Sequence, residues 1–234
     1  MQKPKFVENK IYHIYNRGVE KRKTFLDKQD YLRFIHNLFE FNDEAATKNL
    51  FFYFNRLTSE VEPHYLKPNR EPRKLLVNIL AFCLMPNHFH LLVQQIKENG
   101  VVRFMQKLGT GYTMYFNQKY ERVGGLFQGR FKAVLVENEA HFIHLPYYIH
   151  CNPLDLAAPE WREREIKDYK KAMRFLENYK WSSHLDYLGK KNFPSVTQRD
   201  FLLEFFEGTK GYEKGISTWL ETMELEEFNH LILE

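Results

Sequence analysis

The segment that most constrains the fold is Leu84–Val93, in which two apolar runs meet at a Pro-Asn turn. A run rich in β-forming residues precedes the turn and a second apolar run follows it, so the segment predicts a strand, a tight turn and a second strand. Successive side chains on a strand alternate between its faces, which places His88 and His90 on one face and Phe89 on the other. Two histidines on one face of a strand can supply two ligands of a metal site, but such pairs also occur simply as solvent-facing residues.

The hydrophobic periodicity along the chain predicts a strand-helix-strand-strand-helix-strand order. Asp27 is expected to cap the first helix, with Asp30 three residues further on. The predicted elements are a strand over 11–18, a helix from Asp27 to Phe39, strands over 76–82 and 88–93, a helix over 101–116 and a strand over 131–137. This order is the split β-α-β arrangement of a ferredoxin-like fold, so we predict an α+β domain with an antiparallel sheet. Gly109 and Gly111 weaken the second helix, and the sequence leaves open whether they provide slack or close packing.

Composition limits the class of protein. A chain of 234 residues, 44% of them hydrophobic, can bury one sizeable core with an appended helical lobe. No apolar run reaches the roughly 20 residues that span a bilayer, and the N-terminus lacks the apolar region of a secretory signal, so we expect a cytoplasmic protein without a membrane partner. Cys83 and Cys151 lack paired metal spacing, which argues against a disulfide scaffold or a zinc finger.

Charge is unevenly distributed along the chain. The residues through Leu135 include 22 basic and 12 acidic side chains, whereas the remainder has 12 basic and 18 acidic ones. The basic half contains the histidine pair, and a polyanion would be attracted to it. Arg17 ends the first predicted strand, and the cluster 21–23 follows directly. A loop so rich in cations is suited to gripping phosphates, although a solvated turn has the same composition.

The histidine segment has the form L-M-P-N-H-x-H-L-L-V, which resembles the signature of HUH single-tyrosine transposases, the IS200-like family, and most closely their REP-associated branch. Four further blocks occur in the order typical of the family. These are Tyr12-His13-Ile14-Tyr15-Asn16-Arg17-Gly18, Gly125-Leu126-Phe127-Gln128-Gly129-Arg130-Phe131-Lys132, Tyr148-Ile149-His150-Cys151-Asn152-Pro153 and Trp181-Ser182-Ser183. The resemblance implies the same ferredoxin-like fold, with helices packed on one face of the sheet.

The resemblance also implies a domain division. We expect a catalytic domain over residues 1–153, interrupted by an insert at about 43–74 that the compact family pattern lacks, and a helical C-terminal extension over 154–234. The aromatic start of the insert at 51–54 suits either an ordinary core or the stacking of unpaired bases.

A short helix from about 138 to 152 carries the expected nucleophile. His144, Tyr148 and Asn152 are spaced at i, i+4 and i+8 and share a helical face. By resemblance, Tyr148 is the nucleophile and Asn152 joins His88 and His90 as the third metal ligand, while adjacent Tyr147 is the competing tyrosine. Since Asn152 precedes a proline, its conformation is expected to leave the helix. Pro146 is expected to kink the helix.

The chemistry implied by the resemblance is cleavage of single-stranded DNA. A divalent ion, Mg²⁺ or Mn²⁺, suits the mixed nitrogen and oxygen ligands and polarises the scissile phosphate, while the tyrosine forms a 5′-phosphotyrosine and releases a 3′-hydroxyl. The group that takes the phenol proton is not identified by the sequence; His144 and His150 are the neighbouring candidates.

The expected partner is hairpin-forming single-stranded DNA, and the sequence leaves both a monomer and a homodimer open. The expected DNA-binding residues are Arg17, Lys21, Arg22, Lys23, Arg130 and Lys132. Two other functions compete with a transposase. The first is a non-catalytic, domesticated protein that holds a DNA hairpin. The second is an RNA-binding ferredoxin-like domain, for which the strands show no aromatic stacking motif.

Overall fold

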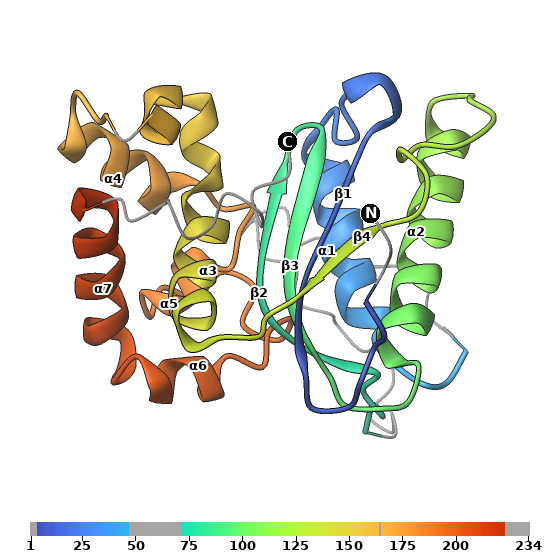
Figure 1. Cartoon of the computed structure of the whole chain (residues 1–234). Helices are drawn as coiled ribbons and strands as arrows, with labels where there is room; N and C mark the ends of the chain where they lie inside the picture. Colours follow the sequence, from blue (N-terminus) through green and yellow to red (C-terminus); the bar gives the residue numbers. More distant parts are fainter. Residues whose placement is uncertain (1–3, 47–71, 164, 223–234) are drawn as a thin grey trace.

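A four-stranded antiparallel sheet forms the centre of the molecule (Figure 1). The structure is a computed structural model that describes residues 4–46, 72–163 and 165–222. The strands are β1 (Ile11–Arg17), β2 (Val77–Met85), β3 (His88–Gln95) and β4 (Lys132–Leu135), in the spatial order β2-β3-β1-β4. Together with the two helices that connect them, this order is that of the split β-α-β fold, so the predicted fold class is confirmed.

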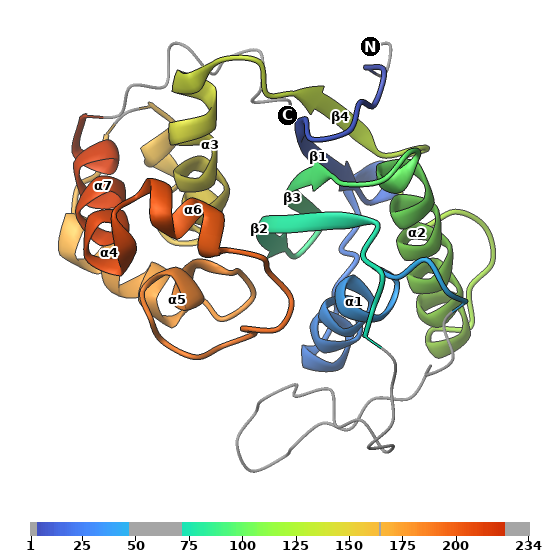
Figure 2. The same ribbon diagram turned by 90° about the horizontal axis from the view of Figure 1, so that it is seen from below.

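One face of the sheet is covered by α1 (Lys28–Glu40) and α2 (Gly100–Lys119) (Figure 2). The predicted start of α1 is correct: Asp27 is its N-cap and accepts a hydrogen bond of 3.1 Å from the backbone N–H of Asp30. The Asp30 carboxylate in turn accepts from the backbone of Asp27, which completes a capping box. Phe34 of α1 packs on Phe89 of β3 within the core of this layer.

The other face is covered by a layer of helices formed by the C-terminal half of the chain (Figure 2). The layer consists of α3 (Glu139–Cys151), η2 (Asn152–Leu156), η3 (Pro159–Glu163), α4 (Tyr169–Asn178), α5 (His184–Tyr187), α6 (Asp200–Phe205) and α7 (Gly208–Thr222). Its apolar side chains form a second core with Leu80, Met85 and Leu92 on the sheet. The two helices of the split β-α-β unit therefore lie on one face, as expected, and the later helices cover the other face.

The Trp181-Ser182-Ser183 block lies along the outer edge of β2. The backbone N–H of Leu84 donates to the carbonyl of Trp181 at 2.9 Å, and that of Ser183 donates to Phe82 at 3.0 Å. The Trp181 ring also stacks on Tyr31 of α1, with 4.5 Å between ring centroids. The block thus covers the backbone groups that an edge strand would otherwise expose, and it connects the two helical layers.

Several local predictions differ from the structure. The strand predicted over 131–137 is shorter, while Pro146 lies inside α3 and the predicted kink there stays a prediction. Asn152 keeps helical dihedral angles, φ −48° and ψ −37°, and the chain continues directly into η2, so the expected departure from the helix is wrong.

Most of the insert, residues 47–71, lies outside the described residues, and the predicted domain limits at 153 and 154 stay predictions. Within the part of the chain that the structure describes, no helix combines the length and apolar character needed to cross a bilayer.

Candidate active site

The two histidines of β3 lie on the sheet face that is turned toward α3 and η2, as the alternation along the strand predicts. Their ring centroids are 5.0 Å apart. Each ring is held through its Nδ1 atom: His88 Nδ1 lies 2.7 Å from Oδ1 of Asn87, and His90 Nδ1 lies 2.9 Å from Nε2 of His13. Since an amide oxygen only accepts, His88 donates from Nδ1 and its Nε2 keeps a lone pair.

The Nε2 atoms of both rings suit a metal ion. Both are buried, and neither has a hydrogen-bond partner among the described residues. Burial lowers the pKa of His88 to about 4, although the neighbouring Asn152 side chain acts in the opposite direction. Burial also lowers the pKa of His90 well below its usual value, so both rings are neutral at pH 7. Two buried imidazole nitrogens without partners, beside an amide oxygen, fit a divalent cation with mixed nitrogen and oxygen ligands.

Tyr148 of α3 faces these histidines. Its ring lies edge-on to His90 with 5.9 Å between centroids, and it also approaches His13 at 6.3 Å. Only 1% of Tyr148 is exposed. The adjacent Tyr147 points the other way, into the helical layer, where its ring packs on Phe206 at 5.1 Å. Of the two competing tyrosines, Tyr148 is therefore the one that the fold brings to the histidine pair.

Asn152 is fully buried one turn after Tyr148. Its Nδ2 donates to the carbonyl of Tyr148 at 3.0 Å, and its Oδ1 accepts from Nη2 of Arg162 at 3.3 Å. Arg162 also directs Nη1 toward the phenol oxygen of Tyr148 at 3.4 Å. The Asn152 amide is therefore oriented by hydrogen bonds on both ends, with its oxygen on the side of the arginine and the histidines.

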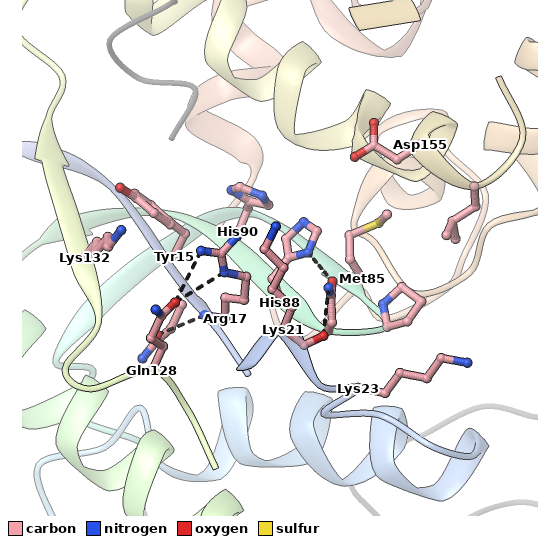
Figure 3. A pocket seen from close by; sticks show the side chains of 14 residues that line it. Tyr15, Arg17, Lys21, Lys23, Met85, His88, His90, Gln128, Lys132 and Asp155 are labelled. Carbon is pink, nitrogen blue, oxygen red and sulfur yellow. Dashed lines mark hydrogen bonds between the residues drawn. The ribbon is translucent and has the colours of Figure 1, made fainter. Parts of the chain in front are cut away.

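A pocket of about 560 Å³ opens beside the histidines (Figure 3). Four of the six predicted DNA-binding residues line it, together with both histidines; these four are Arg17, Lys21, Lys23 and Lys132. The Arg17 guanidinium donates to Oε1 of Gln128 at 3.3 Å, which holds it along the pocket wall. The pocket is therefore cationic on the side of β1 and β4.

The other two predicted DNA-binding residues do not line this pocket. Arg22 turns back to Glu20, with 3.3 Å between Nη2 and Oε2, and Arg130 is exposed outside the pocket. The two candidates for the proton acceptor lie in different surroundings. His150 is buried, with its two nitrogens bonded to Tyr212 and Ser183, while His144 lies half-buried one turn before Tyr148.

Sequence reasoning missed three residues of the site: His13, Asp155 and Arg162. His13 could have been found, because it alternates with Tyr15 and Arg17 on β1 and so shares the face of the neighbouring histidines. Asp155 and Arg162 lie after the helix, on η2 and η3, and their pairing depends on how the chain folds back. No spacing along the sequence marks that contact.

Comparisons with known proteins agree with the resemblance. The family model described as "Transposase IS200 like" matches residues 55–152, which include the histidine pair, Tyr148 and Asn152. The resemblance of this segment to the IS200-like transposase family is therefore confirmed. No curated protein matches the chain.

Among solved structures, the fold is similar to that of a REP-associated tyrosine transposase bound to a REP hairpin. The TM-score is 0.51 at 12% sequence identity, and the match covers 84% of this chain and 89% of the other. At this identity the likeness concerns the fold, and it extends to the helical layer after residue 153 because most of both chains is covered.

Proposed function

We propose that this protein is a transposase that cleaves and rejoins single-stranded DNA through a 5′-phosphotyrosine on Tyr148. The observation that carries the proposal is the meeting of Tyr148 with His90, at 5.9 Å between ring centroids, beside two buried imidazole nitrogens without hydrogen-bond partners among the described residues. The match to the IS200-like transposase family supports the same reaction class.

In this proposal His88, His90 and Asn152 hold a divalent ion, Mg²⁺ or Mn²⁺. When bound, the ion supplies Lewis acidity toward the oxygens of the scissile phosphate. The residues of the chain orient the metal ligands and supply the nucleophile. Asn87 and His13 fix the two imidazole rings through Nδ1, and α3 presents the phenol oxygen of Tyr148. A phenol attacks phosphorus directly, so the bond energy of the phosphodiester is kept in the phosphotyrosine and a 3′-hydroxyl can later reverse the step.

The proposed substrate is a single strand that forms a hairpin. Arg17, Lys21, Lys23 and Lys132 line one pocket with the histidines and offer several cations to a phosphate backbone. The structural neighbour is bound to a REP hairpin, which supports this choice of partner. Arg22 and Arg130 are proposed to contact DNA only outside the pocket.

The proposal includes a cytoplasmic location without a membrane partner.

The reaction is proposed to occur within a single chain. Tyr148 and His90 meet inside one copy of the fold, because α3 packs on β2 and β3 of the same sheet. A mixture of a Tyr148→Phe protein with a His90→Ala protein should therefore stay inactive. Recovery of cleavage in the mixture would show that the tyrosine of one subunit serves the histidines of another.

The test of the proposed reaction uses a labelled single-stranded hairpin, incubated with and without Mn²⁺ and separated on a denaturing gel. We expect a covalent protein-DNA band that requires the metal and disappears in Tyr148→Phe. Tyr147→Phe is the matched control, since that phenol lies in the helical layer, and it should keep the band. A full yield of adduct from Tyr148→Phe would exclude the proposed nucleophile.

A non-catalytic protein that holds a hairpin is the second candidate function. The observation that favours it is the burial of Tyr148, which is only 1% exposed. A nucleophile must be reached by its substrate, and this phenol is almost completely covered. This function predicts hairpin binding with a normal dependence on salt, and no adduct in the presence of Mn²⁺.

A further inference from the structure

Arg162 is the cation that lies against the reacting oxygen. Its Nη1 lies 3.4 Å from the phenol oxygen of Tyr148, and its Nη2 lies 3.3 Å from Oδ1 of Asn152. Both contacts are longer than the 2.7–3.2 Å of a good N–H···O bond. They are therefore weak enough to be exchanged when a better acceptor arrives.

The Asp155 carboxylate fixes the orientation of the guanidinium. Arg162 Nε donates to Oδ1 of Asp155 and Nη2 donates to Oδ2, both at 2.7 Å, which is a two-pronged arrangement. Trp161 Nε1 also donates to Asp155 at 2.7 Å, so the carboxylate is itself held from a second direction. A guanidinium held in this way presents its Nη1 edge to Tyr148 with little loss of side-chain entropy.

The charge of Arg162 is secure. Burial alone would lower the pKa of its guanidinium, but the hydrogen bonds to Asp155 and the field of Tyr148 outweigh burial and raise it. The side chain of Arg162 is 23% exposed, whereas Tyr148 is 1% exposed. A phosphate that reaches the phenol from solvent therefore also comes within reach of the guanidinium.

In-line attack requires the phosphate to come close to the phenol oxygen of Tyr148. Reacting atoms lie about 3–3.5 Å apart in a near-attack arrangement, so the scissile phosphorus must come about that close to the phenol oxygen of Tyr148. The guanidinium nitrogen is 3.4 Å from the same oxygen. A phosphate that approaches the phenol from the side of Arg162 would then bring a non-bridging oxygen within hydrogen-bond reach of Nη1.

We propose that Arg162 is a further catalytic residue, which binds a non-bridging oxygen of the scissile phosphate and stabilises the negative charge that develops there during attack by Tyr148. This inference rests on the proposed phosphotyrosine reaction. In that step the bond between the phenol oxygen and phosphorus forms, and the bond from phosphorus to O3′ breaks. The phenol proton passes to water, and the leaving O3′ takes a proton from water. Arg162 gives up no proton and acts by charge alone.

The first test measures the rate of adduct formation on the hairpin with saturating DNA and Mn²⁺. Loss of one preorganised charge-stabilising donor lowers the turnover rate by about 100-fold to 1000-fold in other enzymes, and we expect a decrease in this range for Arg162→Ala. Arg162→Lys keeps the charge and should recover part of the loss. Arg174→Ala is the matched control, because Arg174 is exposed on α4 and donates to the backbone carbonyl of Lys170 in its own helix.

In Arg162→Ala the Asp155 carboxylate loses its cationic partner, and its negative charge would repel DNA. The double variant Arg162→Ala with Asp155→Asn removes this charge, and it should remain slow if the guanidinium is what the phosphate needs. Recovery of the wild-type rate in the double variant would overturn the proposal. So would a wild-type rate in Arg162→Ala.

The second test measures binding and needs no catalysis. In the Tyr148→Phe background and without divalent metal, hairpins with a normal phosphodiester and with a neutral methylphosphonate at the mapped cleavage position are compared by fluorescence anisotropy. We expect tighter binding of the charged phosphate, and we expect this preference to vanish when Arg162→Ala is added. A preference that is unchanged by Arg162→Ala would contradict a direct contact, even if the rate had fallen.

The two proposals fail separately. If the wild-type protein forms no adduct under any metal condition, the phosphotyrosine reaction itself fails. If the wild-type protein forms the adduct and the Arg162 variants match it in rate and in phosphate preference, only the role of Arg162 fails.

Discussion

His90 depends on a second histidine for its orientation. The His13 ring lies nearly parallel to that of His90, with 5.1 Å between centroids, and its Nε2 is 2.9 Å from Nδ1 of His90. When His90 donates this hydrogen bond, its Nε2 atom is left with a lone pair directed into the site. Partners of this kind fix the tautomer and the ring orientation of metal-binding histidines.

Replacement of His13 by Ala should therefore weaken binding of the proposed metal ion while the three proposed ligands, His88, His90 and Asn152, remain in place. We expect a decrease in Mn²⁺ affinity of about 10-fold to 100-fold, as found for other partners of ligating histidines. Titration of Mn²⁺ followed by electron paramagnetic resonance measures it. His13→Gln retains a hydrogen-bonding group and should lose less affinity. Equal affinity in wild type and His13→Ala would show that His90 is oriented without its neighbour.

For single residues, the sequence predicts that the two histidines share a face, but it does not predict the contact between His13 and His90. Strand alternation was enough to place His88 and His90 on one face, since it depends only on spacing. The contact from His13 to His90 depends on the pairing of Tyr15 with His90 across β1 and β3, and register of this kind is a property of two strands far apart in the chain.

At the scale of elements, the two central glycines of α2 differ in the space around them. A Cβ added at Gly111 would overlap the Phe41 ring, whereas one added at Gly109 would meet nothing within 4 Å. Gly111 is therefore required for close packing between α2 and the end of α1, which answers one of the alternatives that the sequence left open.

The pair of variants Gly111→Ala and Gly109→Ala separates packing from helix propensity. Gly111→Ala should destabilise the protein by about 1–3 kcal/mol because the core is overpacked. Gly109→Ala should stabilise it by up to about 1 kcal/mol, since alanine favours the helix. Urea denaturation measures both. A stabilising effect of Gly111→Ala would mean that Phe41 moves aside at little cost.

The end of α3 illustrates where a local rule fails. The residue before a proline normally avoids the helical region, yet Asn152 stays in it and Pro153 opens η2. The cost of that conformation is offset by the two hydrogen bonds of the Asn152 side chain, to the carbonyl of Tyr148 and from Arg162, which also satisfy the buried amide. The first contact lies one turn back in the same helix, whereas the second comes from η3 and is not marked by any spacing in the sequence.

Across the whole molecule, a buried polar network connects the helical layer to α3. The Tyr212 hydroxyl of α7 lies 2.8 Å from Nδ1 of both His150 and His184, and His150 Nε2 lies 2.7 Å from Oγ of Ser183. Ser183 in turn accepts from the backbone N–H of Phe82 on β2 at 2.9 Å. The network therefore fixes the rotation of α3, and with it the direction of Tyr148, relative to the sheet.

This network makes stability depend on pH. Burial lowers the pKa of His184 to about 3, with a smaller contribution from Lys190, and burial also lowers that of His150 well below 6.5. Between the unfolded value of 6.5 and the lowered folded value, the unfolded chain binds more protons than the folded one. The free energy of unfolding should therefore decrease as the pH falls below about 6.5, by about 1.4 kcal/mol per pH unit for each such histidine.

Urea denaturation at several pH values between 7.5 and 4.5, in the presence of a chelator, tests this dependence. The His184→Gln variant should be less stable at pH 7 but should lose stability less steeply on acidification, since one titrating group is gone. Identical slopes for the variant and the wild type would show that His184 does not titrate in this range.

The account as a whole depends on Tyr148 being the residue that carries DNA. The most direct measurement is mass spectrometry of peptides from the covalent protein-DNA complex formed with Mn²⁺ and trimmed by nuclease. The account predicts a nucleotide 5′-phosphate attached to Tyr148, in the peptide that also contains Tyr147. Attachment to Tyr147 or to any other residue would contradict the account.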